Sequence, residues 1–241
     1  MTGHLTKRDV ERLIADPSPD TRAEMAAKVA AEIDRRRLTQ AERQLAESIA
    51  RIMARDAALR VRQALAENLK ATPNLPRDVA LMLARDVEAV ALPILEASVV
   101  LTDEDLVELV RTGSEAKQAA IALRPEVAAP VADALVDHGT GAVVAALVGN
   151  AGADLSDGAL GRVVDRFGAD PAVQEPLVRR ARLPLTVSER LVTLVSDRLR
   201  DYLVTHHDLP AALASDIVLK SRERATVTLF VAAATPAADN D

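Results

Sequence analysis

The sequence predicts an all-α protein, an α-α superhelix (solenoid) built from short HEAT-like helix pairs, and three observations support this. The 241 residues are 49% hydrophobic but only 1% aromatic, so the core must consist of Ala, Leu, Val and Ile side chains. Ala and Leu have the highest helix propensities, and small side chains suit closely packed helices. A short segment recurs along the chain, and the segments between its copies begin and end with helix-capping residues.

The recurring segment is found in five copies, whose starts are separated by 29, 27, 26 and 30 residues. The copies are VRQALAENL from Val61, VALPILEAS from Val90, KQAAIALRP from Lys117, VVAALVGNA from Val143 and VQEPLVRRA from Val173. Their fifth position is always aliphatic: Leu65, Ile94, Ile121, Leu147 and Leu177. Their fourth position is always small or Pro: Ala64, Pro93, Ala120, Ala146 and Pro176. A large residue beside a small one at this period indicates a helix face that packs on its neighbours.

A second helical segment is expected after each copy. These segments start at Leu75, Leu101, Val127, Leu155 and Leu185. The pairs Thr102 with Asp105 and Thr186 with Glu189 predict capping boxes, and Ser156 predicts an N-cap. At the other ends, left-handed C′ residues are expected at Gly113, Gly139 and Gly168. A pair of about 26–30 residues cannot bury its own apolar face, so neighbouring pairs must stack.

The remaining segments are expected to close the two ends of one continuous domain. Residues 1–55 predict N-terminal capping helices, with Thr39 and Glu42 capping one from about Gln40. Residues 56–197 form the five pairs, and residues 198–234 the C-terminal closing helices. Residues 187–205 could run as one helix, followed by a last helix from about Pro210 to Val231. The tail, residues 235–241, is expected to be disordered.

Charge and composition exclude several classes of protein. Residues 1–86 hold 16 basic and 13 acidic residues, whereas residues 87–241 hold 14 basic and 23 acidic ones. An acidic chain with three aromatic residues is a poor nucleic-acid binder, because binding needs phosphate neutralisation and stacking. No Cys is present, and no apolar run approaches the roughly 18 residues of a membrane span. The charged N-terminus does not read as a signal peptide, so a soluble cytoplasmic protein is expected.

The sequence also resembles a known bacterial family. The resemblance rests on LPRDVALMLARD, on PILEASVVLTDEDLVELVRTGSEAKQAAIALRP and on FGADPAVQEPLVRRARLP, with VADALVD and GNAGADLSDGAL between the last two. The family is the uncharacterised domain of unknown function number twenty-three thirty-six, found mainly in alphaproteobacteria. The resemblance extends over about residues 20–225 and is most specific over Leu75–Arg182. It implies a HEAT-like fold but no activity, cofactor or catalytic residue, and relatives often look longer at the C-terminus.

Three clusters could form chemical sites, but each has a simpler structural explanation. The run His206-His207-Asp208 is expected to be a solvated helix end, because adjacent helical side chains point about 100° apart and no further metal ligands are evident. The Gly-rich segment Gly149–Gly158 lacks the Lys of a phosphate loop and the ligands of a calcium loop, so it predicts an inter-helix loop. The acids from Asp103 to Asp105 fit the first turn of a helix. No catalytic, cofactor or metal site is predicted.

The leading functional hypothesis is a non-catalytic protein–protein interaction module, an adaptor or scaffold. Solenoids bind peptides or proteins on their curved surfaces, usually along the second helix of each pair. A polar ridge on those helices is the candidate partner-binding site, and an unknown protein with a basic or amphipathic segment is the expected partner. The ridge consists of Glu104, Glu108, Arg111, Asp133, Asp137, Arg162 and Asp165.

Two alternatives remain. One is a HEAT-like enzyme such as a DNA glycosylase or a pigment lyase, although a glycosylase would need a basic, aromatic groove. The other is a regulatory homo-oligomer, such as a homodimer, that pairs through the last helix at Leu213, Ile217 and Val227.

Overall fold

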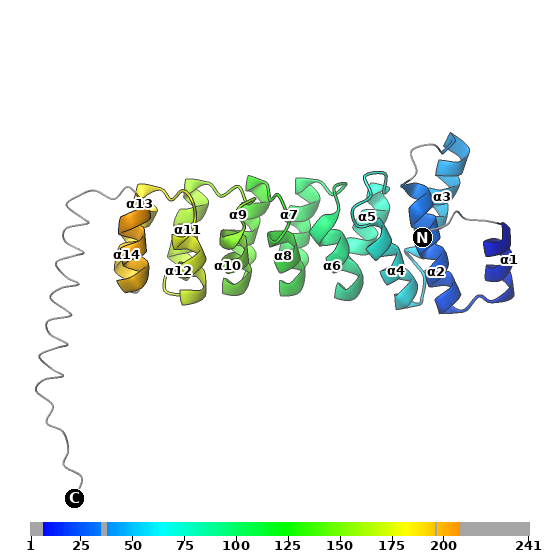
Figure 1. Cartoon of the computed structure of the whole chain (residues 1–241), viewed down its shortest axis with the longest axis horizontal. Coiled ribbons are helices and arrows are strands. Elements are labelled where there is room, and N and C mark those ends of the chain that lie inside the picture. Colours follow the sequence, from blue (N-terminus) through cyan, green and yellow to red (C-terminus); the bar gives the residue numbers. More distant parts are fainter. Residues whose placement is uncertain (1–6, 35–37, 196, 208–241) are drawn as a thin grey trace, which may run out of the picture. The chain divides into compact units, whose positions relative to one another are not determined.

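The computed structural model describes residues 7–34, 38–195 and 197–207, and in these residues the secondary structure is helical (Figure 1). The helices are α1 (Lys7–Ala15), α2 (Pro19–Ile33), α3 (Gln40–Met53), α4 (Leu59–Leu69), α5 (Arg77–Ala84), α6 (Glu88–Ala97), α7 (Asp103–Thr112), α8 (Glu115–Ala122), α9 (Ala129–His138), α10 (Gly141–Gly149), α11 (Asp157–Phe167), α12 (Pro171–Val178), α13 (Leu185–Leu194) and α14 (Asp197–His206). The described part of the chain contains no strand, only an isolated parallel β-bridge between Val127 and Ala153. The predicted all-α class is confirmed.

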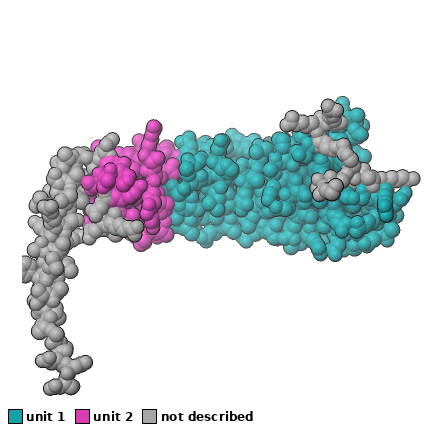
Figure 2. Space-filling view, in the orientation of Figure 1, with its two compact units in different colours: residues 1–154 teal, residues 155–241 magenta. Residues whose placement is uncertain are grey.

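The chain divides into two compact units, residues 1–154 and 155–241, which are coloured separately in Figure 2. In the first unit, α2, α4, α6, α8 and α10 contact one another in succession, and α7 contacts α9. Figure 1 shows these two rows of helices. In the second unit, α11 contacts α13 and α12 contacts α14. This packing of each helix against the next helix but one is that of an α-α solenoid.

The recurring segment forms the first helix of each pair, and its fifth position supplies the centre of the core. Leu65, Ile94, Ile121, Leu147 and Leu177 are all 0% exposed. The residue before each of them, small or Pro, is buried at Ala120 and half-buried in the other four copies. A core almost without aromatic rings is thus built from aliphatic side chains. This part of the sequence-based prediction is confirmed. The second helices share buried positions in the pattern i, i+1, i+4 and i+5, as Val131, Ala132, Leu135 and Val136 do in α9, which also buries Ala134.

Helix starts agree with the sequence at three positions and disagree at one. Thr39 and Thr102 form complete capping boxes with Glu42 and Asp105. Ser156 caps α11 by accepting a hydrogen bond from the Ala159 N–H. The capping box predicted at Thr186 is wrong. The N-cap of α13 is Pro184, so Thr186 already lies inside the first turn.

The left-handed glycines predicted at the helix ends are also wrong. Gly113, Gly139 and Gly168 are the C-cap residues of α7, α9 and α11, but their φ angles are −84°, −75° and −60°. A close approach explains glycine there instead. A Cβ on Gly139 would lie 2.5 Å from the Leu135 carbonyl oxygen of its own helix and 3.0 Å from Val143 Cγ1. A Cβ on Gly168 would lie 2.5 Å from the Val164 carbonyl oxygen and 3.0 Å from Leu194 Cδ1. The absence of a Cβ lets the chain lie close to the last turn of the helix that it leaves and lets a neighbouring helix pack closely.

Residues 187–205 do not form one helix. The α13 helix ends at Leu194, Val195 is extended with ψ 161°, and α14 begins at Asp197. Side chains replace the hydrogen bonds that the break removes. The Arg200 guanidinium donates to the Val192 and Val195 carbonyls, and the Gln174 amide donates to the Leu194 carbonyl.

The longer N-terminal helices are present as expected: α2 has 15 residues and α3 has 14, against 8 to 11 in α4–α14. The helix expected from Pro210 to Val231 and the tail at 235–241 lie outside the described residues. The domain boundaries drawn from the sequence therefore stay a prediction.

Candidate functional site

The predicted ridge lies on the second helices of the pairs. Glu104, Glu108 and Arg111 follow one another at i, i+4 and i+7 along α7, and all three are exposed. In α9, which packs against α7, Asp137 is exposed and Asp133 is half-buried. The structure therefore brings four acids and one arginine together on two neighbouring helices of the first unit. The last two ridge residues, Arg162 and Asp165, lie on α11 in the second unit.

Ion pairs occupy part of this ridge. Glu108 accepts a bond of 2.9 Å from Arg85, and Asp165 pairs with Arg190. Both pairs are about half exposed, so each holds its acid weakly and can exchange for a partner's charge. Glu104 lies in the first turn of α7. Its own backbone N–H and the Thr102 hydroxyl hold the pKa of its carboxyl below the ordinary value, which keeps it ionised.

A second set of ion pairs is more buried and links successive pairs of helices. Arg62 binds Asp86 at 2.6 Å, and Arg77 binds Asp105 with a closest distance of 2.6 Å. A hydrogen bond from Arg77 lowers the pKa of Asp105, whose side chain is 7% exposed. The sequence pattern alone places Asp105 only at a helix start. Its Arg partner lies 28 residues away and no local pattern reveals it.

Polar side chains also bind the free carbonyl groups of the preceding helix pair. Arg124 donates to the Leu95 carbonyl at 2.6 Å, and Asn150 donates to the Ala122 carbonyl at 2.8 Å. His207 Nε2 lies 3.0 Å from the Val178 carbonyl oxygen. Leu95, Ala122 and Val178 hold the same position in their helices, so these three contacts are one repeated interaction. These polar side chains could suggest a chemical site, but their contacts show that they stabilise the packing of neighbouring helix pairs.

The remaining sequence candidates are placed as follows. His206 stacks on Tyr202 with ring centroids 4.0 Å apart. Within the described ranges, no group of three His, Cys, Asp or Glu side chains could hold a metal ion. Asp208 lies outside these ranges, as do Leu213, Ile217 and Val227. The Gly-rich segment is the connection between α10 and α11, as predicted.

Two pockets accompany these features. One of about 510 Å³ in the first unit is lined by Arg22, Arg51, Ile52, Arg55, Asp56 and Ala57. The Arg22 and Arg51 guanidiniums there are bound by Asp56 and Asp78, so most of its positive charge is already neutralised.

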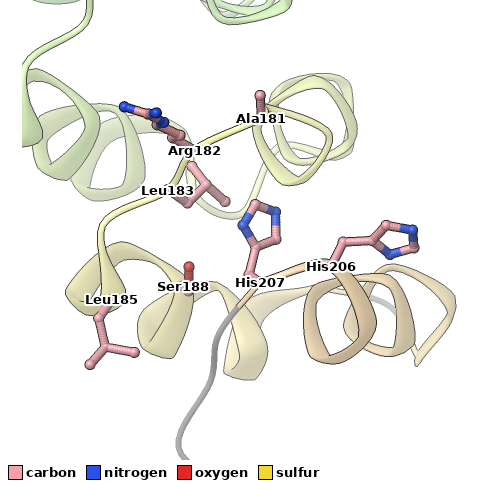
Figure 3. A pocket seen from close by; sticks show the side chains of 7 residues that line it. All are labelled: Ala181, Arg182, Leu183, Leu185, Ser188, His206 and His207. Atoms are coloured by element: carbon pink, nitrogen blue, oxygen red, sulfur yellow. The ribbon is translucent and has the colours of Figure 1, made fainter.

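The other pocket, of about 370 Å³, lies in the second unit where the α12–α13 connection meets the end of α14 (Figure 3). It is lined by Ala181, Arg182, Leu183, Leu185, Ser188, His206 and His207. The sequence-based prediction did not include this pocket. The available signal was Ser188, a polar residue at a helix position that is apolar in α5, α7, α9 and α11.

Comparisons with known proteins give the family but no activity. No curated protein and no solved structure matches the chain. No helix in the described residues is long and apolar enough to cross a membrane. The sequence pattern of the family described as "uncharacterised protein conserved in bacteria (DUF2336)" matches residues 90–239, more than half of the chain. The chain therefore belongs to the DUF2336 family of bacterial proteins.

Proposed function

We propose that this protein is a non-catalytic interaction module, an adaptor or scaffold with HEAT-like repeats that binds another protein in the bacterial cytoplasm. The observation that carries the proposal is the exposed acidic ridge on α7 and α9. Glu104, Glu108 and Asp137 are exposed there on two helices that pack side by side. A row of like charges on neighbouring helices attracts a segment of opposite charge.

The partner we propose presents a basic or amphipathic helical or extended segment. Its Lys and Arg side chains would meet Glu104 and Asp137 and displace Arg85 from Glu108. Arg111, at the C-terminal end of α7, would contact an acidic or polar residue that sets the direction of the segment. Asp133 and, on the second unit, Arg162 and Asp165 are the further ridge residues in this proposal.

The test begins with the partner, captured by proximity labelling and cross-linking mass spectrometry in the native cell. Binding is then compared with the triple variant Glu104→Lys, Glu108→Lys and Asp137→Lys. Three reversed contacts worth about 0.5 kcal/mol each predict roughly tenfold weaker binding near physiological salt. The association rate should fall and its salt dependence should diminish, because exposed charges act mainly on the encounter.

A matched control carries the same change of charge away from the ridge. Glu67, Glu96 and Glu126 are exposed, and Glu67 forms an exposed pair with Lys70 much as Glu108 does with Arg85. The variant Glu67→Lys, Glu96→Lys and Glu126→Lys should bind almost as well as the wild type. If the two triple variants lose affinity equally, net charge acts rather than the ridge. If neither loses affinity, the partner binds elsewhere.

A further inference from the structure

Three second helices of the first unit end in arginines at the same position. In each second helix from α3 to α13, two adjacent buried residues end the core face, and the residue directly after them is exposed. That residue is Arg55 after α3, Arg85 at the C-cap of α5 and Arg111 in the last turn of α7. These three equivalent residues form the arginine row.

The helix dipole alone does not explain the arginine row. A cation is favourable near the C-terminus of a helix, which would account for one such arginine. The same position, however, holds Asp137 in α9 and Asp165 in α11, and both are exposed. The fold therefore accepts either sign of charge at this position. Three arginines in succession, followed by an acid, need an explanation outside the helices themselves.

The arginine row is available to a partner. Arg55 and Arg111 are exposed, and their side chains have no partner among the described residues. Arg85 binds Glu108 at 2.9 Å, but both side chains are about half exposed, and such a pair exchanges readily for another charge. The residues on both sides of each arginine belong to the described part of the chain, so the surroundings of the row are known.

Ion pairs connect the helices that carry the row. Arg51 of α3 binds Asp78 of α5 at 2.7 Å, and Arg77 of α5 binds Asp105 of α7 at 2.6 Å. Neighbouring helices in such a stack lie roughly 10 Å apart, which is about the length of three residues of an extended chain. An extended segment with an acidic residue at every third position would therefore meet one arginine in each helix pair.

A pocket lies at the first position of the row. It has a volume of about 510 Å³, and both Arg55 and Ile52 line it. Ile52 is 71% exposed, although it is a large aliphatic residue. The other two arginines of the pocket, Arg22 and Arg51, are bound by aspartates, so Arg55 is its unpaired charge. The pocket can thus hold one aliphatic side chain against Ile52 next to an acid on Arg55.

We infer that the arginine row binds an extended acidic segment of a partner protein. An aliphatic side chain of the segment occupies the pocket against Ile52, and acidic residues at every third position pair with the row. Asp137 holds the next equivalent position, so a basic residue of the segment meets the acidic ridge there. The inference rests on the proposed function as an interaction module, but the row takes a segment of opposite charge to the one proposed for the ridge.

The test uses the full chain and the peptide acetyl-Leu-Ser-Glu-Ser-Gly-Glu-Ser-Gly-Glu-amide, in which Glu recurs at every third position. Resonances of the ¹⁵N-labelled protein are followed by NMR at about 50 mM salt, where exposed charges are weakly screened. The resonances of Arg55, Arg85 and Arg111 should shift in a saturable way. A peptide of the same composition with its three Glu residues adjacent should bind about fivefold more weakly, because it cannot reach all three arginines.

Variants of the protein separate the row from net charge. The triple variant Arg55→Glu, Arg85→Glu and Arg111→Glu should bind the peptide at least about tenfold more weakly, because each exposed contact changes the affinity about twofold to threefold. The matched control makes the same change of charge at three arginines that are in exposed ion pairs away from the row. This control, Arg12→Glu, Arg179→Glu and Arg190→Glu, should bind almost as well as the wild type.

The pocket is tested separately. Ile52→Ala should weaken the binding of the peptide about threefold, because less apolar surface is buried against its Leu side chain. The same substitution should not affect a peptide that carries Ser in place of Leu. Because Ile52 is mostly exposed, the variant should keep the fold. An equal loss for both peptides would show that the Leu side chain does not occupy the pocket.

Three results would overturn the inference. The first is the absence of a saturable shift at the arginine row. The others are equal binding of the spaced and the adjacent Glu peptides, and an equal loss of affinity in the two triple variants, since net charge and not the row would then act. The ridge variant Glu104→Lys, Glu108→Lys and Asp137→Lys should bind the acidic peptide at least as tightly as the wild type, so each proposal fails separately.

Discussion

The guanidinium of Arg77 in α5 binds both carboxylate oxygens of Asp105 in α7, with N–O distances of 2.8 and 2.6 Å. Asp105 also accepts the Thr102 N–H at 3.0 Å and so closes the capping box of α7. One buried carboxylate therefore both caps the N-terminus of α7 and binds α7 to the preceding helix pair.

Removing that carboxylate should cost more than removing an exposed one. Asp105→Ala should lower the free energy of unfolding by about 1.5–3 kcal/mol, the range for a hydrogen bond to a charged group. Glu67→Ala, which breaks the exposed pair with Lys70, should change it by about 0–1 kcal/mol. Urea unfolding at neutral pH measures both values. If both variants lose the same free energy of unfolding, the contact between Arg77 and Asp105 does not link the helix pairs.

Acid should weaken the fold through the same type of contact. Hydrogen bonds from Arg22 and Arg77 lower the pKa values of Asp56 and Asp105 in the folded chain. A lowered folded pKa gives stability that is fully present above the unfolded value of about 3.9 and is lost as the pH falls through the folded value. The free energy of unfolding should therefore be steady from pH 7 to about 5 and fall below about 4. The double variant Asp56→Asn with Asp105→Asn should show a shallower fall, and an unchanged fall would assign the effect to other carboxylates.

Two glycine substitutions should act in opposite directions. Gly152→Ala places a Cβ 1.9 Å from the Pro125 carbonyl oxygen, and such overpacking typically costs about 1–3 kcal/mol. Gly161→Ala lies inside α11 with nothing within 4 Å of its Cβ, so it should stabilise the chain by about 0.5–1 kcal/mol. Thermal unfolding followed by circular dichroism gives both shifts. A stable Gly152→Ala protein would mean that the bridge to Val127 can move aside.

Ser188→Ala should make the protein more stable. The change removes a buried hydroxyl without a partner, and Ala already holds this position in α5 and α9. A gain of up to about 1 kcal/mol in the free energy of unfolding is expected, since the penalty for an unpaired buried group is about 1–3 kcal/mol. Urea unfolding measures it, and a loss of stability greater than 1 kcal/mol would show that the hydroxyl is bound within the fold.

The sequence could predict the helices because their signals are local. The large aliphatic residue at the fifth repeat position and the caps at Thr39, Thr102 and Ser156 each depend on neighbours within one helix. The errors arose where a distant residue decides the outcome. Arg200 and Gln174 stabilise the break after Leu194. Gly139 and Gly168 are explained by steric contacts of a Cβ with the last turn of the same helix and with a packed neighbour, not by backbone handedness.

The candidate sites likewise divide into one that local sequence signals predict and one that depends on packing between segments. Exposed positions on α7 and α9 follow from helical periodicity, so the ridge could be proposed from the sequence. The pocket beside Leu183 could not, because only the packing of the fold brings the α12–α13 connection next to the end of α14. Ser188 was visible in the sequence, but its meaning depends on knowing that its repeat position is buried.

The carbonyl contacts of Arg124, Asn150 and His207 restrict how this chain can be shortened, lengthened or shuffled. Each side chain has a different length and number of donors, yet each meets a carbonyl at the same helix position. A helix pair moved to another place would bring a donor that does not fit its new neighbour. Fragments for expression should therefore end after Asn150, not before it, and engineered repeats should be inserted together with the residue that follows them.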